Sequence, residues 1–284
     1  MKILVIGATG MLGNTLYRLF STAPGIQAFG SVRDGRAKSM FAPETRRNLI
    51  EGVDVGDINS LIQLFGKTRP DVAVNCIGLI KQLGSASEPL QAIPINSLLP
   101  HTLARLADAT QSRLIHLSTD CVFRGDRGNY HESDTPDAQD LYGRSKLLGE
   151  VDYPHAVTLR TSIIGHELRS SNGLIEWFLS QEHSVRGFSR AIFSGLPTLE
   201  IGRLILSHVI PNPQLRGLYH VASEPISKLD LLRLVAEVYG KKISIVPDDS
   251  LKIDRSLNAT RFNTTLDYKP PSWPALVEQM KVFG

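Results

Sequence analysis

The chain has 284 residues, of which 42% are hydrophobic and 21% charged, and a net charge of +3. This length is enough for one large domain or for two unequal lobes with a buried core. The basic residues are spread along the chain, which argues against a nucleic-acid-binding arm, and no apolar run approaches the ~20 residues of a membrane span.

The cysteines and histidines lack the spacing of a disulfide framework or a metal centre. Cys76 and Cys121 each follow an apolar run. The eight histidines, His116 among them, show no paired ligand spacing and are assigned to the core or the surface. Because the chain also begins without the layout of a secretory signal, we expect reduced thiols, a cytoplasmic location and no metal.

The first predicted strand, Lys2 to Ile6, leads directly into the sequence GATGMLG and then into a helical pattern. Gly7, Gly10 and Gly13 therefore occupy a strand-to-helix turn, where a backbone without Cβ can approach a pyrophosphate at a helix amino end. The turn predicts dinucleotide binding, although its spacing is GxxGxxG and a tight turn without a ligand is the alternative.

The next two predicted strands carry residues that choose between cofactors. A strand over residues 27–32 ends in Arg33, which favours NADP because an arginine accommodates a 2′-phosphate, whereas Asp34 keeps NAD open as the less favoured cofactor. A third strand over residues 48–53 ends at Asp54, whose carboxylate can accept a hydrogen bond from an adenine amino group.

A fourth predicted strand, residues 71–76, places Asn75, Ile77 and Gly78 over the cofactor. A helical pattern over residues 98–109 follows, preceded by Asn96. Alternating strands and helices indicate an α/β fold, a Rossmann-like doubly wound parallel sheet with helices on both faces. In such a sheet the carboxyl ends of the strands meet at one edge, where ligands bind.

The fifth predicted strand, residues 114–117, delivers Ser118, Thr119 and Asp120 at that same edge. Tyr142 and Lys146 follow at the i, i+4 spacing that places two side chains on one helix face. A cation beside a phenol favours the phenolate and lowers its pKa from about 10. The pair therefore suits proton transfer, with a surface helix that carries both residues incidentally as the alternative.

With these motifs in place, the chain resembles the extended short-chain dehydrogenase/reductases, and among them the dTDP-4-dehydrorhamnose reductases. The resemblance is strongest at GATGMLG, STDCVF, YGRSK and LRTSIIG. It implies that Thr119, Tyr142 and Lys146 form the catalytic triad and that Asn96 belongs to a proton relay. The cofactor residues expected on these grounds are Gly7, Thr9, Gly10, Met11, Leu12, Gly13, Arg33, Asp54, Val55, Asn75, Cys76, Ile77, Gly78, Tyr142 and Lys146.

Two positions depart from the pattern of those reductases. Cys121 stands where they have tyrosine, and Ile163 where they have a sugar-contacting tryptophan. The related 4,6-dehydratases carry Thr-Asp-Glu after the fifth strand, and the glutamate is absent here, so dehydration is not expected. The expected substrate-binding residues are Thr119, Asp120, Cys121, Ile163, Arg186 and Arg255.

The pattern changes after about residue 160. We expect residues 1–160 to form an NADP-binding Rossmann domain and residues 161–284 a smaller, partly interleaved substrate lobe. Arg186 and Arg255 are candidates for diphosphate contacts because an arginine fork fits phosphate oxygens, and surface ion pairs are the alternative for both.

The sequence thus predicts an enzyme that uses NADPH to reduce a 4-keto, nucleotide-linked 6-deoxy sugar in surface-polysaccharide synthesis. Two alternatives stay open: a nucleotide-sugar epimerase, and a non-catalytic NADP-binding regulatory subunit. The expected partner is the nucleotide-sugar substrate, with no nucleic acid and no membrane. The oligomeric state is open, with a homodimer as one candidate.

Overall fold

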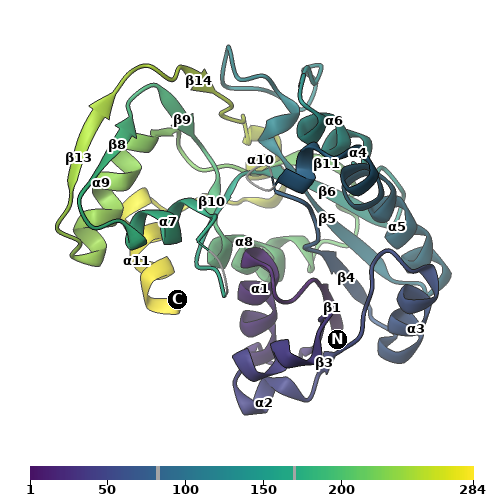
Figure 1. Cartoon of the computed structure of the whole chain (residues 1–284). Coiled ribbons are helices and arrows are strands. Elements are labelled where there is room, and N and C mark those ends of the chain that lie inside the picture. Colours follow the sequence, from purple (N-terminus) through teal and green to yellow (C-terminus); the bar gives the residue numbers. More distant parts are fainter. Residues whose placement is uncertain (81–83, 169–170) are drawn as a thin grey trace. The chain divides into compact units, whose positions relative to one another are not determined.

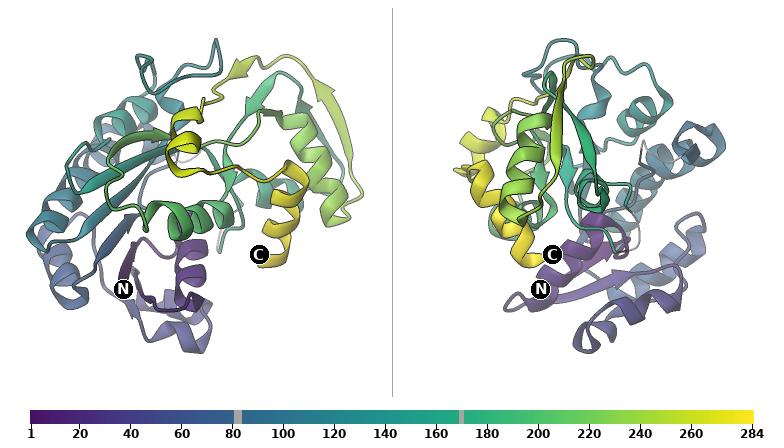
Figure 2. Two further views of the ribbon diagram at one scale, coloured as in Figure 1. Left: turned by 180° about the vertical axis from the view of Figure 1, so that it is seen from behind. Right: turned by 60° about the vertical axis from the view of Figure 1, so that its left-hand side comes forward.

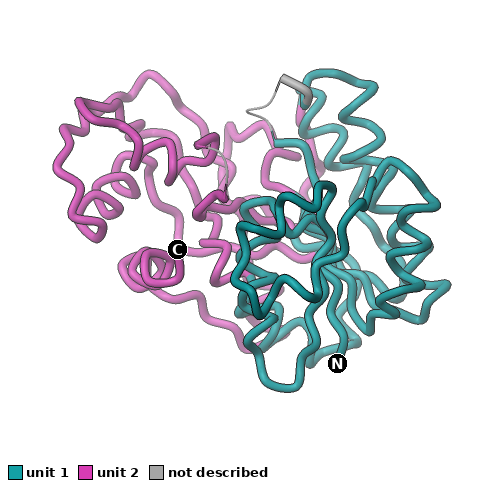
Figure 3. The backbone as a smooth tube through the Cα atoms, turned by 60° about the horizontal axis from the view of Figure 1, so that its bottom comes forward, with its two compact units in different colours: residues 1–118, 139–159, 202–218 teal, residues 119–138, 160–201, 219–284 magenta. Residues whose placement is uncertain are grey.

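The computed structural model describes residues 1–80, 84–168 and 171–284 (Figure 1). The chain divides into two compact units (Figure 3). Unit 1 comprises residues 1–118, 139–159 and 202–218, and unit 2 comprises residues 119–138, 160–201 and 219–284. The two units are interleaved along the chain, which enters unit 2 at residue 119, returns to unit 1 over residues 139–159, and returns to it again at residue 202. No helix in the described ranges is long and apolar enough to cross a membrane.

The central element is a seven-stranded sheet with the order β11-β6-β5-β4-β1-β2-β3, and helices cover both of its faces (Figure 2). The four neighbouring pairs from β3 to β5 are parallel. This confirms the predicted α/β class and the doubly wound arrangement. The strands are β1 (Lys2–Ile6), β2 (Gln27–Ser31), β3 (Leu49–Ile50), β4 (Val72–Asn75), β5 (Arg113–Thr119), β6 (Ala156–Thr161) and β11 (Gly217–His220).

Strand β3 is shorter than the predicted run over residues 48–53. Its pairing with β2 ends at Ile50, and Gly52 then adopts the left-handed region with φ +72°. An extended ladder does not continue through that conformation. The helices that accompany these strands are α1 (Met11–Thr22), η1 (Gly35–Met40), α2 (Pro43–Arg46), α3 (Ile58–Thr68), η2 (Gly84–Ser87), α4 (Pro89–Ala92), η3 (Ile93–Leu98), α5 (Leu99–Ala109) and α6 (Leu141–Leu148).

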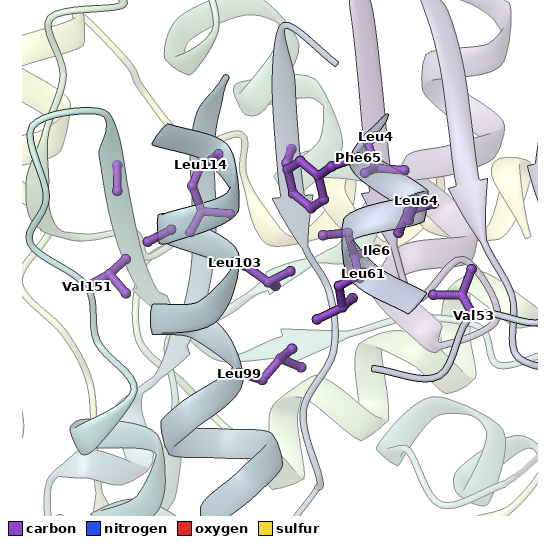
Figure 4. Close-up of a cluster of buried hydrophobic side chains, with 14 residues drawn as sticks. Leu4, Ile6, Val53, Leu61, Leu64, Phe65, Leu99, Leu103, Leu114 and Val151 are labelled. Atoms are coloured by element: carbon purple, nitrogen blue, oxygen red, sulfur yellow. The ribbon is translucent and has the colours of Figure 1, made fainter. Parts of the chain in front are cut away.

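A hydrophobic core fills the space between the sheet and helices α3 and α5 (Figure 4). Leu4 and Ile6 alternate along β1 to face it, and Leu61, Leu64 and Phe65 recur at helical spacing along α3. Each such side chain contributes roughly 1.5–3 kcal/mol when it leaves water. The core thereby fixes β1 and β4, whose carboxyl ends carry the candidate cofactor residues.

Unit 2 contains three small sheets, with the strand orders β10-β7, β12-β9-β14 and β13-β8. Three of these strands, β8, β9 and β10, follow one another over residues 184–197. Helix α8 and the π-helical η5 carry the chain from unit 2 back to unit 1. The elements are η4 (Asp120–Val122), β7 (Ile163–Ile164), α7 (Leu174–Ser180), β8 (Ser184–Phe188), β9 (Ala191–Phe193), β10 (Leu196–Pro197), α8 (Thr198–Leu204), η5 (Ile205–Val209), β12 (Ile226–Ser227), α9 (Lys228–Tyr239), β13 (Ser244–Asp248), β14 (Ile253–Asp254), α10 (Thr260–Leu266) and α11 (Trp273–Phe283).

Packing of α1 against β1 depends on Gly13. A Cβ at this position would lie 2.0 Å from the carbonyl oxygen of Gly7, so Gly13→Ala forces the helix away from the turn. We expect a loss of roughly 2 kcal/mol in the free energy of unfolding, as for other overpacking changes. Urea titration followed by circular dichroism measures it.

The matched control is Gly66→Ala in α3, where a Cβ meets no atom within 4 Å. Alanine in this exposed helix position should raise the free energy of unfolding by roughly 0.5–1 kcal/mol. Equal effects of the two substitutions would contradict the close approach of Gly13 to Gly7.

Candidate active site

The turn between β1 and α1 has the geometry of a pyrophosphate cradle. Gly7 adopts φ +91°, and Gly10 is the N-cap of α1 without any side-chain cap, so the N–H groups of the first turn are not capped by a side chain. A Cβ on Gly10 would meet only the Gly7 carbonyl oxygen, at an ordinary 3.6 Å, which leaves the approach to that turn open. Free N–H groups and the positive end of a helix dipole favour a phosphate group there. Thr9, Met11 and Leu12 line the same turn and the start of the helix.

The end of β2 presents one unpaired cation. Arg33 is exposed and has no hydrogen-bond or ion-pair partner within the described ranges. Asp34, in contrast, caps η1 by accepting from the Arg36 backbone N–H and forms a 2.6 Å ion pair with the Arg36 guanidinium. Its carboxylate is thus engaged with its own loop, which leaves Arg33 as the group suited to a 2′-phosphate.

Past β3, Asp54 is exposed and its Oδ1 accepts the Gly56 backbone N–H at 2.9 Å. Val55 is half-buried and packs against the core cluster. One carboxylate oxygen of Asp54 is therefore used in a local turn. The other oxygen is the part of this side chain that suits an adenine amino group.

At the end of β4, Asn75 is buried and Gly78 is exposed. Asn75 is 1% exposed, and its Oδ1 accepts the Ile77 N–H at 3.0 Å. Ile77 packs on the glycine turn, since a Cβ on Gly7 would lie 2.5 Å from its Cδ1. Burial raises the pKa of the Cys76 thiol, which keeps it neutral. Gly78 is exposed, whereas the Asn75 side chain is buried.

Helix α6 buries Lys146, which is 5% exposed. Its Nζ donates to the Leu117 carbonyl oxygen at 2.8 Å, and within the described ranges this is the one hydrogen-bond acceptor it contacts. An ammonium has three donors, so two remain for a ligand. Tyr142 is half-buried one helical turn earlier, on the same face of α6.

Burial of Lys146 has an energetic cost. Desolvation lowers its pKa from 10.5 to about 8, against the opposing attraction of Glu150, and this shift corresponds to roughly 3 kcal/mol. Below about pH 8 the ammonium is charged in both folded and unfolded chains, so the full destabilisation is present. The cost disappears as the pH rises towards 10.5, because the folded chain releases the proton first.

Asn96 is 1% exposed and lies in the π-helical turn η3. Its Oδ1 accepts the Leu79 N–H at 2.9 Å, and its Nδ2 donates to Ser145 Oγ at 3.1 Å. The backbone of this turn approaches α6 so closely that a Cβ on Gly149 would lie 1.9 Å from the Asn96 carbonyl oxygen. Asn96 and Lys146 also meet around Gly78, where a Cβ would lie 3.7 Å from both Asn96 Oδ1 and Lys146 Nζ.

In unit 2, Thr119 and the short helix η4 form a second cluster. Thr119 Oγ1 accepts the Cys121 N–H at 3.1 Å and donates to Asp120 Oδ1 at 3.2 Å. Burial raises the pKa of Asp120, against the attraction of Arg255. Burial likewise raises the pKa of Cys121 to about 12, so this thiol stays neutral. Arg255 is half-buried and donates through Nε to the Phe123 carbonyl oxygen at 2.7 Å.

The two remaining substrate candidates, Ile163 and Arg186, lie on other strands and make contacts of their own. Ile163 is half-buried on β7, where it pairs with Leu196 of β10. Arg186 is exposed on β8 and bonded to Asp248 at 3.1 Å, as a surface ion pair would be. A phosphate would have to replace that carboxylate before Arg186 could bind it.

The structure thus brings the predicted residues together in two groups. The glycine turn, the residues after β4, Asn96, Tyr142 and Lys146 belong to unit 1. Thr119, Asp120, Cys121, Ile163, Arg186 and Arg255 belong to unit 2. Over the described ranges, no group of three or more His, Cys, Asp or Glu side chains is arranged to hold a metal ion.

One residue beside the site, His116, was expected only as a core or surface histidine. His116 on β5 is fully buried, and its Nδ1 lies 3.1 Å from Asn75 Nδ2. It is the parallel-strand partner of Asn75, and a register prediction for β4 and β5 is the signal that would have found it.

Comparison with known proteins gives relatives over nearly the whole chain. A family model described as RmlD substrate binding domain matches residues 1–280. The probable low-salt glycan biosynthesis reductase Agl14 of Haloferax volcanii is 27% identical over 273 residues, which cover 92% of this chain and 87% of that protein. Methionine adenosyltransferase 2 subunit beta of Danio rerio is 29% identical over 252 residues, covering 84% of this chain and 74% of that protein.

Solved structures share the fold. The dTDP-4-dehydrorhamnose reductase of Bacillus anthracis in complex with NADP superposes with a TM-score of 0.79 at 19% identity, over 99% of this chain and 98% of that one. The family match covers nearly all of the sequence, which confirms the resemblance drawn from its motifs: the chain belongs to the RmlD substrate-binding domain family.

Proposed function

We propose that the protein reduces the 4-keto group of a nucleotide-linked 6-deoxy sugar with NADPH. The observation that carries the proposal is Lys146, a buried ammonium one helical turn after Tyr142 that uses one of its three donors within the described ranges. A buried cation in this place destabilises the fold, so its presence beside Tyr142 favours a catalytic use. The reductase names of two of the similar proteins, Agl14 and the B. anthracis enzyme, support the same reaction class.

Each residue has a role that follows from its chemistry. When bound, NADPH supplies the hydride. Tyr142 donates a proton to the oxygen of the reduced carbonyl, and Lys146 favours the phenolate that remains while its free N–H groups hold the nicotinamide ribose. Thr119 donates a hydrogen bond to the carbonyl oxygen and stabilises the negative charge that develops there. Asn96 orients a water that returns the proton to this site.

The cofactor assignment rests on residues that fit a dinucleotide phosphate. The turn at Gly7, Gly10 and Gly13 admits a pyrophosphate, and Arg33, past the end of β2, is a cation without an ion-pair partner among the described residues. The NADP bound to the B. anthracis reductase supports the same choice. NAD is the less favoured cofactor, because Asp34 is paired with Arg36 and offers the ribose no free carboxylate.

The substrate class is a nucleotide sugar, and its exact identity is a separate proposal. Cys121 and Ile163 are smaller than the tyrosine and tryptophan of the resembling reductases, which favours a sugar that differs from the rhamnose precursor. Arg255 is the candidate for an anionic part of the substrate, since only its Nε is bonded within the described ranges. We place this chemistry in surface-polysaccharide synthesis, in the cytoplasm, where the free Cys76 and Cys121 stay reduced.

For the assembly we propose a homodimer. Leu90, Leu98 and Leu148 are 85%, 62% and 66% exposed, and they lie on elements α4, η3 and α6, which contact one another. Large exposed apolar side chains on neighbouring elements favour a covered surface. Molecular mass in solution tests the assembly, and a monomer at micromolar concentration would contradict it.

A non-catalytic, cofactor-binding regulatory subunit is the second candidate. It is favoured by the similarity to methionine adenosyltransferase 2 subunit beta. The intact pair of Tyr142 and Lys146 weighs against it. Tight NADPH binding without turnover on any keto sugar, together with a stoichiometric complex with another enzyme, would establish this candidate instead.

The proton donor gives the first functional test. Tyr142→Phe removes the hydroxyl and keeps the ring, so NADPH binding should persist while kcat falls at least ~100-fold, as expected for loss of a general acid. NADPH absorbance is followed with a panel of dTDP- and UDP-linked 4-keto-6-deoxy sugars. Tyr153→Phe is the matched control, because it removes a hydroxyl bonded to His101 elsewhere in unit 1. A Tyr142→Phe enzyme within a few-fold of wild type would sink the assignment.

The cofactor preference gives the second test. Arg33→Ala should weaken NADPH about tenfold by removing one charge-assisted phosphate contact and leave NADH nearly unchanged. Arg36→Ala is the control, since that guanidinium is engaged by Asp34. Fluorescence titration with both nucleotides measures the effect. Equal losses for NADPH and NADH, or equal losses from the two variants, would contradict the role of Arg33.

A further inference from the structure

His116 is a polar residue at the centre of β5, with Ile115 and Leu117 as its neighbours in the chain. It lies on β5 between Leu114, which belongs to the hydrophobic core, and Ser118, which donates to Glu150 at 2.6 Å. All three side chains point to the same face of the sheet because residues alternate along a strand. The His116 ring is 0% exposed. Its polar atoms must therefore be accounted for inside the protein.

The hydrogen bonds of Asn75 determine which ring nitrogen of His116 carries the proton. Asn75 Oδ1 accepts the Ile77 N–H at 3.0 Å, so the opposite end of the amide, Nδ2, is a donor. This donor lies 3.1 Å from His116 Nδ1. Nδ1 must then be an unprotonated acceptor, and a neutral ring carries its proton on Nε2. Burial, followed by the charge of Lys146, holds the pKa of His116 well below its usual range, which agrees with a neutral ring.

The second ring nitrogen, Nε2, makes His116 unfavourable for stability as a core residue. Nε2 is buried and has no hydrogen-bond partner in the described part of the chain. A leucine would fill similar space without stranding an N–H group. Packing alone therefore does not explain a histidine here, and the contact made by Nδ1 is the remaining use of the ring.

Asn75 connects His116 to two parts of the candidate site. Its Oδ1 fixes the N–H of Ile77, whose side chain covers the Gly7 turn. The next residue, Gly78, is the point around which Asn96 Oδ1 and Lys146 Nζ converge. A rotation of the Asn75 amide would release the Ile77 N–H, and with it the segment that joins the glycine turn to the Lys146 surroundings.

We propose that His116 is a positioning residue: its unprotonated Nδ1 locks the Asn75 amide and thereby holds the Ile77–Gly78 segment in the place that cofactor binding requires. This role rests on the proposed NADPH-binding function. His116 would act through Asn75 and not by touching the cofactor, and it lies in the middle of β5, away from the strand end.

Two substitutions of similar shape separate the acceptor from the packing. His116→Asn places Oδ1 where Nδ1 stood and keeps an acceptor for Asn75, whereas His116→Leu places a methyl group there. We expect His116→Leu to weaken NADPH binding about tenfold, the loss of one buried hydrogen bond, and His116→Asn to stay within about threefold of wild type. Thermal unfolding of both variants shows that each is folded at the titration temperature.

A cofactor-free measurement tests the positioning by itself. Hydrogen exchange at the Ile77 amide should be accelerated in His116→Leu and close to wild type in His116→Asn. In wild type, ¹⁵N NMR of the ring should show a bare Nδ1 and a protonated Nε2 that do not change from about pH 5 to about pH 8, across the range where an ordinary histidine titrates.

The possible outcomes distinguish the role of His116 from the proposed NADPH-binding function. Equal NADPH affinity or equal Ile77 exchange in the Asn and Leu variants would overturn the role of His116, as would a protonated Nδ1. Wild-type protein that binds no NADPH while Ile77 exchange still responds as expected would overturn the proposed cofactor function, and His116 would then hold a segment without that cofactor role.

Discussion

The hydrogen bond from Lys146 Nζ to the Leu117 carbonyl oxygen is the constraint around which the candidate site is built. A charged ammonium at 5% exposure is unstable without specific neighbours. The chain supplies them through its backbone. The π-helical turn at Asn96 packs against α6 at Gly149, where no larger residue fits. Burial of the Lys146 ammonium therefore destabilises the fold locally, and the proposed reaction uses this buried cation.

The residues suited to a cofactor and those suited to a substrate lie in different units. Unit 1 holds the glycine turn, Arg33 and the Tyr142–Lys146 helix, which are the groups suited to a cofactor and to proton transfer. Unit 2 begins at Thr119 with the cluster of Asp120, Cys121 and Arg255, which are suited to a substrate. The sequence passes from one unit to the other at the end of β5. A change in substrate preference can therefore arise in unit 2 without altering the cofactor turn.

Much of this could be predicted from sequence, because strand ends and glycine turns carry local signatures. The strand before GATGMLG, the helix with Tyr142 and Lys146, and the parallel sheet all follow from periodicity and turn chemistry. The direction of the Asn75 amide and the burial of His116 could not be predicted, since both depend on the register between β4 and β5. Likewise, the pairing of Asp34 with Arg36 depends on the η1 turn, and the crossing into unit 2 at residue 119 depends on long-range packing.

The most direct test follows the hydride itself. Wild-type protein is incubated with NADPH that carries deuterium at the transferring position, together with each sugar of the dTDP- and UDP-linked 4-keto-6-deoxy panel, and the recovered sugar nucleotide is analysed by mass spectrometry and NMR. We expect net NADP⁺ formation and a single deuterium at carbon four of the sugar. Interconversion of 4-hydroxy nucleotide sugars in the presence of NADP⁺, without net NADPH oxidation on any keto sugar, would contradict this expectation and indicate an epimerase. Keto sugars recovered unchanged and free of deuterium would contradict any reductase assignment.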